Sequence, residues 1–199
     1  MSDLKTLRGL SGLSPEPASL KKAALILIDI QNTYREGVLR LTGVEPAVAQ
    51  AAILLRRARE AETPVIHIRH NAGPGSPFDI TAASGQICEE VVPQDGEAVI
   101  TKAFPSAFVG TDLEDRLKRA GVTDLILAGF MTHMCVNSTA RSAFNLGFQP
   151  TVVASTTATR DLPAPDGSVV SAVQLQAASL AALGDLFAVV ARDVDAVRH

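Results

Sequence analysis

Residues 23–30 read AALILIDI, a nearly continuous apolar run whose one charged side chain, Asp29, stands next to the end. Such a run is typical of a strand that is buried on both faces of a parallel sheet. Ligands of open parallel α/β sheets bind beyond the carboxyl ends of the strands. Asp29 is therefore expected at the edge of the sheet where a binding site would lie.

Segments of two kinds alternate along the rest of the chain. Apolar or β-branched runs predict strands at 65–68, 97–102, 123–128, 149–154 and 186–190. Helical spacing and capping residues predict helices at 46–62, 111–120, 132–146 and 166–182. Such alternation implies parallel strands joined by right-handed helical crossovers, with helices on both faces of the sheet. The sequence thus predicts an α/β fold, a three-layer sandwich of the Rossmann-like type.

Two of these helices carry a specific prediction for their first residues. Thr111 and Glu114 have the spacing of a capping box, and Asp166 is a residue type favoured at helix N-caps. We expect Thr111 to open the second helix and Asp166 to open the last one.

Length and composition favour one ordinary globular domain. The chain has 199 residues, of which 47% are hydrophobic and 20% charged. Residues 1–20, which Gly and Pro interrupt, are interpreted as an N-terminal extension without an export or membrane segment, and residues 21–199 as the domain. These features predict a cytoplasmic location.

The charge pattern narrows the class of partner. The formal net charge is -3 and the sequence has no run rich in Lys and Arg. Nothing therefore favours binding to the phosphates of nucleic acid or to an anionic membrane. A small-molecule substrate is the expected partner.

The two cysteines, Cys88 and Cys135, are too few for a disulfide framework, so each is interpreted as a separate thiol. Cys135 follows a predicted strand and stands near the start of the next helix. Peptide N–H groups and the helix dipole at that position favour the thiolate over the thiol. The alternative for Cys135, and the preferred interpretation of Cys88, is a small buried or loop side chain.

Three chemically distinct side chains are expected at one edge of the sheet. Asp29 ends the first strand, Lys102 ends a middle strand, and Cys135 stands between a strand and a helix. Each alone has a plainer explanation as a capping, solvated or core residue. Together they provide a carboxylate to accept the thiol proton, a cation to stabilise negative charge, and a nucleophile for acyl transfer. A nucleotide site is disfavoured, because the sequence has no Gly-Lys pair of the phosphate-loop type.

Three ordered segments carry a resemblance to a known family. They are 27–32 (LIDIQN), 100–102 (ITK) with the following Phe104 and 106–108 (SAF), and 129–136 (GFMTHMCV). In this order they resemble the motifs of the isochorismatase-like cysteine hydrolase superfamily, from about residue 23 to 190. The resemblance implies a six-stranded parallel sheet between layers of helices.

The same resemblance implies roles for individual residues. Asp29 would be the general base, Cys135 the nucleophile and Lys102 the cation that orients the pair. The N–H groups of Met131 and Cys135 would form the oxyanion hole, next to a cis peptide bond between Phe130 and Met131. The implied activity is hydrolysis of a small amide-type substrate, at a carbon–nitrogen bond other than a peptide bond, through a thioester on cysteine.

One motif of the family is missing and points to its metal-independent amidohydrolase branch. Nicotinamidases carry an Asp-x-His metal motif after the second strand, where this chain reads His70-Asn71-Ala72. We therefore expect no metal and no cofactor, and His67 is interpreted as structural. Enzymes that cleave isochorismate often lack the cysteine, so Cys135 favours a carbonyl substrate.

Substrate contacts and assembly are less specified by the sequence. The amide and aromatic side chains of Gln31, Tyr34, Phe104 and Phe108 are predicted to line the pocket. The resemblance also implies a homo-oligomer, a dimer or a tetramer. Three alternatives remain: an isochorismatase, a nicotinamidase-like deamidase, and a noncatalytic protein of the same fold that binds a ligand or senses through its thiol.

Overall fold

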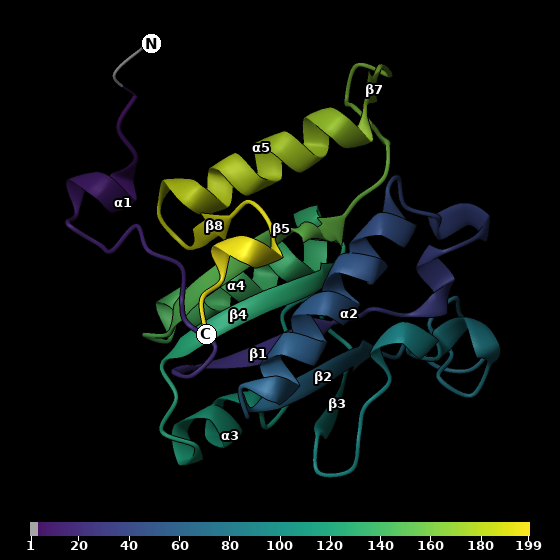
Figure 1. The fold of residues 1–199 in the computed structure, drawn as a ribbon. Helices are drawn as coiled ribbons and strands as arrows, with labels where there is room; N and C mark the ends of the chain where they lie inside the picture. Colours follow the sequence, from purple (N-terminus) through teal and green to yellow (C-terminus); the bar gives the residue numbers. More distant parts are fainter. Residues whose placement is uncertain (1–3) are drawn as a thin grey trace.

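The computed structural model describes residues 4–199, and its centre is a parallel sheet of six strands (Figure 1). The strands lie in the order β3-β2-β1-β4-β5-β8. Their bounds are Ala23–Ile28 for β1, Val65–His70 for β2, Ala98–Lys102 for β3, Asp124–Phe130 for β4, Gln149–Ala158 for β5 and Val189–Ala191 for β8. The strand that AALILIDI predicts is central, and all six residues of β1 are buried. The α/β fold with a six-stranded parallel sheet is confirmed.

Helices cover both faces of this sheet. The helices are α1 (Leu7–Leu10), α2 (Val44–Glu60), α3 (Leu113–Arg119), α4 (Asn137–Asn145) and α5 (Ala172–Asp185). The apolar side of α2 packs in one core with the residues of β1 that face it, such as Leu25 and Leu27. Residues of α3, α4 and α5 pack in the other core against the opposite face of β1, where Ile26 and Ile28 lie. The alternating faces of a strand thus divide the core into two layers.

The N-terminal segment packs against the last helix and strand. Leu7 N donates to Asp185 Oδ1, and the guanidinium of Arg8 donates to the carbonyls of Ser14 and Leu186. Residues 1–3 of the extension expected at 1–20 lie outside the described part of the chain. Among the helices found in residues 4–199, none combines the length and apolar character needed to cross a membrane.

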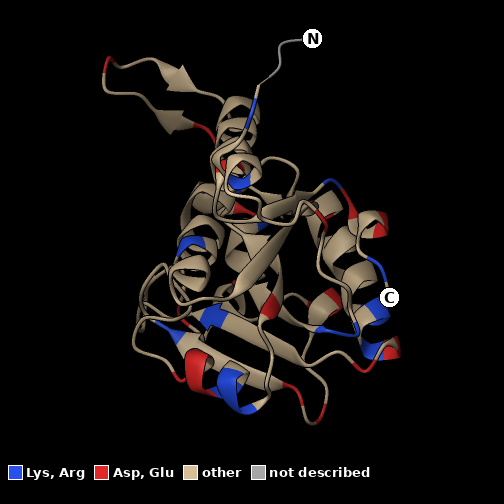
Figure 2. Ribbon diagram, turned by 90° about the vertical axis from the view of Figure 1, so that its left-hand side faces the viewer, with Lys and Arg blue, Asp and Glu red and all other residues tan. Residues whose placement is uncertain are grey.

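The prediction that Asp166 opens a helix is wrong. Residues 162–170 form a small antiparallel hairpin of β6 (Leu162–Pro163) and β7 (Val169–Val170), which projects from the body (Figure 2). Asp166 Oδ1 instead accepts hydrogen bonds from Ser168 N and Oγ in the turn. Helix α5 starts six residues later, at a capping box of Ser171 and Gln174.

The cap expected for α3 is also displaced by one residue. The N-cap is Asp112, whose own side chain makes no capping hydrogen bond. The hydroxyl of Thr111 donates to the carbonyl of Ala107 and accepts from Leu113 N, the first residue of the helix, rather than from Glu114 N. The capping box predicted for Thr111 and Glu114 is therefore wrong, although the helix itself is present.

The sheet has a topological switch point between β1 and β4. From β1 the strand order runs outward through β2 and β3, and from β4 it runs the other way through β5 and β8. The carboxyl ends of the two strands approach closely at Gly129, whose φ is +126°. A Cβ atom at Gly129 would lie 1.9 Å from the carbonyl oxygen of Ile28, immediately before Asp29. Only glycine fits this crossing, and crevices at such switch points are where α/β sheets bind ligands.

We predict that Gly129→Ala destabilises the protein by about 3 kcal/mol or more, because it adds a steric clash to an unfavourable φ. The matched control is Gly184→Ala in α5, where the added Cβ meets Val190 Cγ2 at an ordinary 3.5 Å. That variant should be neutral or more stable, since alanine favours helix. Denaturant unfolding of both variants checks this, and equal stabilities would contradict the role given to Gly129.

Candidate active site

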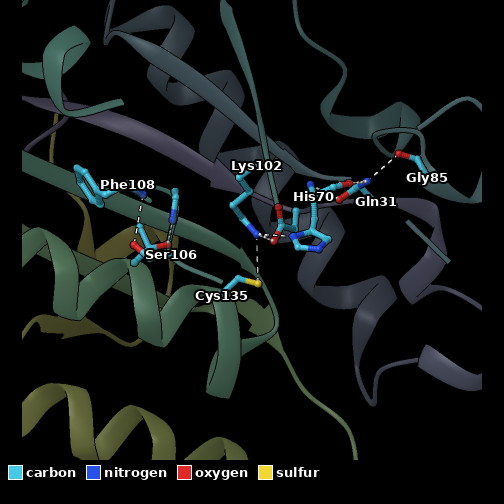
Figure 3. A network of polar contacts seen from close by, with 10 residues as sticks. Gln31, His70, Gly85, Lys102, Ser106, Phe108 and Cys135 are labelled. Carbon is cyan, nitrogen blue, oxygen red and sulfur yellow. Dashed lines mark hydrogen bonds and ion pairs between the residues drawn. The ribbon is translucent and has the colours of Figure 1, made fainter. Parts of the chain in front are cut away.

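The fold brings Asp29, Lys102 and Cys135 together at the carboxyl edge of the sheet. Figure 3 shows Lys102 pointing toward Cys135. Lys102 Nζ lies 2.6 Å from Asp29 Oδ2 and 3.4 Å from Cys135 Sγ. The three residues come from the end of β1, the end of β3 and the turn after β4. Asp29 is 0%, Lys102 2% and Cys135 6% exposed. The site is thus almost sealed from solvent, where ionic interactions are strong.

Asp29 reaches the site through an unusual backbone conformation. Its φ is +51°, in the left-handed region, its N–H donates to the carbonyl of Ile68, and its own carbonyl accepts from Gln31 N. Burial raises the pKa of Asp29 above its ordinary value, while Lys102 and the Cys135 thiol act in the opposite direction. Within residues 4–199, neither Asp29 Oδ1 nor Oδ2 has a hydrogen-bond partner, and Oδ2 is held by the ion pair with Lys102, so the carboxylate retains capacity to take a proton.

The surroundings of Cys135 do not favour the thiolate, contrary to the expectation from its sequence position. It lies inside a π-helical turn, Thr132–Val136, and α4 begins only after it. Burial raises the pKa of the Cys135 thiol to about 12, the Asp29 carboxylate raises it too, and Lys102 opposes both. These effects favour the protonated thiol over the thiolate.

The peptide bond between Phe130 and Met131 is cis, as the resemblance implied. The carbonyl of Met131 accepts hydrogen bonds from Met134 N and Val136 N, which closes the turn around Cys135. This turn brings the backbone of Met131 and Cys135, the two expected oxyanion donors, into one short segment. Their function as donors stays a prediction.

The four side chains expected to contact substrate lie in different environments. Gln31 is fully buried, and its amide group bonds the backbone of His70 and Gly85. Tyr34 is buried, and its ring packs edge-on against Phe130, with centroids 5.7 Å apart, next to the cis peptide. Burial, followed by the neighbouring Asp29, raises the pKa of Tyr34. Phe104 is 54% exposed, and Phe108 stacks on Phe148 and lies away from Lys102 and Cys135 in Figure 3. Of the four, Tyr34 remains the best placed to border the reacting groups.

His70 is the residue whose contact with Lys102 the sequence analysis did not predict. Its Nδ1 lies 3.1 Å from Lys102 Nζ, and burial, followed by the charge of Lys102, lowers its pKa to about 4. The position of His70 at the end of a strand, on the same edge as Asp29 and Lys102, is the signal that could have found it. His67, on the same strand, instead bonds Glu97, in agreement with a structural role.

The described residues hold no cluster of three or more His, Cys, Asp or Glu side chains arranged to bind a metal. The Nδ1 atom of His70 already makes a hydrogen bond with Lys102 Nζ. His133 Nδ1 lies 2.6 Å from Thr159 Oγ1, beside the strand end that borders the cis peptide.

A buried acid, a cation and a thiol thus lie together at the switch point of a parallel α/β sheet. The model of the isochorismatase domain matches residues 23–192. The chain belongs to the isochorismatase family.

Relatives extend over most of the chain. The crystal structure of an isochorismatase from Pseudomonas putida KT2440 is 40% identical, covers 98% of this chain and 99% of its own, and superposes with a TM-score of 0.94. The secreted isochorismatase effector Isc1 of Verticillium dahliae is 33% identical and covers 92% of this chain and 95% of its own. Maleamate amidohydrolase of Pseudomonas putida is 36% identical over 67% of this chain and 70% of its own.

The electrostatics of the site predict an unusual effect of Asp29→Asn. Because the Asp29 carboxylate raises the pKa of Cys135, its neutralisation should lower that pKa and speed alkylation by iodoacetamide at pH 8 about tenfold. Lys102→Met should slow alkylation, since it removes the charge that favours the thiolate. Rates are measured by mass spectrometry of the Cys135 peptide in variants whose circular dichroism is unchanged. Slower alkylation of Asp29→Asn would contradict the assignment.

Proposed function

We propose that the chain hydrolyses a carbon–nitrogen bond of a small amide-type substrate, with Cys135 as nucleophile, Asp29 as base and Lys102 as the orienting cation. The observation that carries this proposal is the contact of Lys102 with both Asp29 and Cys135 in a nearly solvent-free site. Two plainer explanations account for only part of this arrangement. A purely structural ion pair would not explain the thiol beside it, and a purely structural core cysteine would not explain the buried ion pair.

In the first half-reaction the thiol proton passes to Asp29 while Sγ bonds to the substrate carbonyl carbon. The carbonyl oxygen becomes an oxyanion, which accepts hydrogen bonds from the N–H groups of Met131 and Cys135. Collapse of this tetrahedral species breaks the C–N bond. The leaving nitrogen takes the proton from Asp29 and departs as ammonia or an amine, which leaves a thioester on Cys135.

In the second half-reaction water attacks the thioester carbonyl. Asp29, again a carboxylate, accepts the proton of the water and returns it to the sulfur as the thioester breaks. The products are a carboxylic acid and the free thiol, so no electron donor or metal is needed for balance. Lys102 keeps its place beside the carboxylate and the sulfur through both steps.

The amide class is favoured over the other hydrolyses of the family for two reasons. A thiol nucleophile suits a carbonyl carbon, which it can convert to a thioester. The name of a relative, maleamate amidohydrolase, describes the cleavage of an amide by a protein of the same family.

Ammonia release from a panel of small primary amides, ureido acids and nicotinamide tests the proposal. We expect turnover that survives treatment with a chelator and falls about 10³-fold or more in Cys135→Ala. Cys88→Ala is the matched control, because this second buried thiol lies outside the site, and it should retain activity. Turnover that persists in Cys135→Ala would contradict the mechanism.

The pH dependence of kcat/KM should report Asp29. Activity requires the carboxylate, so it rises as the pH passes through the pKa of Asp29, which burial places above that of an ordinary aspartate near 4. We expect the midpoint of the acid limb of the pH profile to lie above the pKa of an ordinary aspartate. The profile is measured over the pH range in which circular dichroism shows that the protein is folded. An acid limb at or below pH 4 would contradict the environment assigned to Asp29.

We also propose a cytoplasmic location. Cys88 and Cys135 are both free and buried, and a reducing compartment keeps thiols in that state. Cell fractionation followed by immunoblotting tests this, and recovery from the culture medium would place the protein with its relative named a secreted effector.

A further inference from the structure

Lys102 contacts three acceptors, and each comes from a different part of the fold. Its ammonium group has three N–H donors. Nζ lies 2.6 Å from Asp29 Oδ2, 3.4 Å from Cys135 Sγ and 3.1 Å from His70 Nδ1. Asp29 and Cys135 are the proposed reacting groups, which leaves His70 as the partner that the mechanism does not use.

The place of His70 follows from the register of the sheet. His70 and Lys102 are direct partners in the parallel pairing of β2 and β3, and Asn71 N donates to the carbonyl of Lys102. The two side chains therefore leave neighbouring strand ends on the same side. This register places the imidazole and the ammonium group within reach of each other.

Gln31 holds His70 on the side toward β1. Gln31 Oε1 accepts from His70 N at 2.9 Å, and Nε2 donates to the carbonyls of His70 at 3.0 Å and Gly85 at 2.7 Å. The ring of Phe78 meets the imidazole edge-on, with centroids 4.8 Å apart. Figure 3 shows His70 lying between Gln31 and Lys102, with dashed lines for the hydrogen bonds.

We propose that His70 is a positioning residue for the hydrolysis: its Nδ1 accepts the third N–H of Lys102 and holds the ammonium between Asp29 and Cys135. This inference rests on the proposed function. It requires a neutral imidazole with Nδ1 unprotonated, so the ring proton is on Nε2. Gln31 supports it from behind and belongs to this framework rather than to the substrate pocket.

Other functions for His70 fit the contacts less well. A general base would need its free nitrogen near the thiol, but Nδ1 is already bonded to Lys102. A metal ligand would need partner ligands, and no such cluster exists within residues 4–199. With its pKa lowered to about 4 by burial and by Lys102, His70 is neutral at pH 7, as a hydrogen-bond acceptor for Lys102 must be.

Substitutions that keep or remove the acceptor separate positioning from simple packing. His70→Asn places an amide oxygen close to the position of Nδ1, whereas His70→Leu fills the space without an acceptor. His70→Phe, which also lacks an acceptor, replaces the leucine variant if that one does not fold. The matched control is His67→Asn, a buried histidine of the same strand that bonds Glu97 instead.

The readout is the rate at which iodoacetamide alkylates Cys135 at pH 8, with Cys135→Ala as the background. Loss of the acceptor should let the ammonium turn away from the sulfur and raise the pKa of the thiol. Alkylation of His70→Leu should slow about tenfold, which corresponds to one pKa unit, while His70→Asn and His67→Asn stay within about threefold of wild type. In ammonia release, His70→Leu should lower kcat with KM changed less than about threefold.

Two results would overturn the inference: wild-type alkylation in a folded acceptor-free variant, or equal slowing in His70→Asn and His70→Leu. A rise in KM alone would also overturn it, because it would make His70 a substrate contact. Alkylation needs no substrate. If the expected alkylation pattern is found but the panel releases no ammonia, the amidohydrolase proposal fails while the positioning of Lys102 by His70 stands.

Discussion

The buried contact between Asp29 and Lys102 is the interaction on which the site depends. Both side chains have been removed from water, so each charge needs the other, and the loss of one partner leaves an uncompensated ion in the interior. The pair in turn sets the electrostatics of Cys135, because one charge raises the thiol pKa and the other lowers it. In the proposed mechanism, the thiol keeps its proton beside Asp29, its proposed base, until a substrate carbonyl group binds.

The architecture of the sheet produces this contact. Asp29 and Lys102 stand at the ends of β1 and β3, which β2 separates, so only a long side chain reaching across the strand ends can join them. Gly129 allows β4 to approach β1 at this edge, and the turn after β4 then presents Cys135. The same edge carries His70 at the end of β2, which gives Lys102 a neutral third partner.

Much of this arrangement could be predicted from local sequence, and the remainder depends on distant partners. The run AALILIDI predicts a central strand and the place of Asp29, because burial on both faces leaves little choice of residue type. Local sequence could not distinguish a turn at Asp166 from a helix N-cap, because Asp is common in both. The pairing of β6 with β7 makes it a turn. Gln31 was predicted as a substrate contact, but its amide bonds backbone groups 39 and 54 residues away, which no local pattern reveals.

A double-mutant cycle on the free energy of unfolding tests most directly whether Asp29 and Lys102 act as one unit. The variants are Asp29→Asn, Lys102→Met and the pair combined, unfolded by denaturant at pH 7. We expect each single substitution to cost about 3–5 kcal/mol and the double variant to cost clearly less than their sum, because neither charge is left alone. Additive losses would show that the two residues do not depend on each other, and would contradict the account.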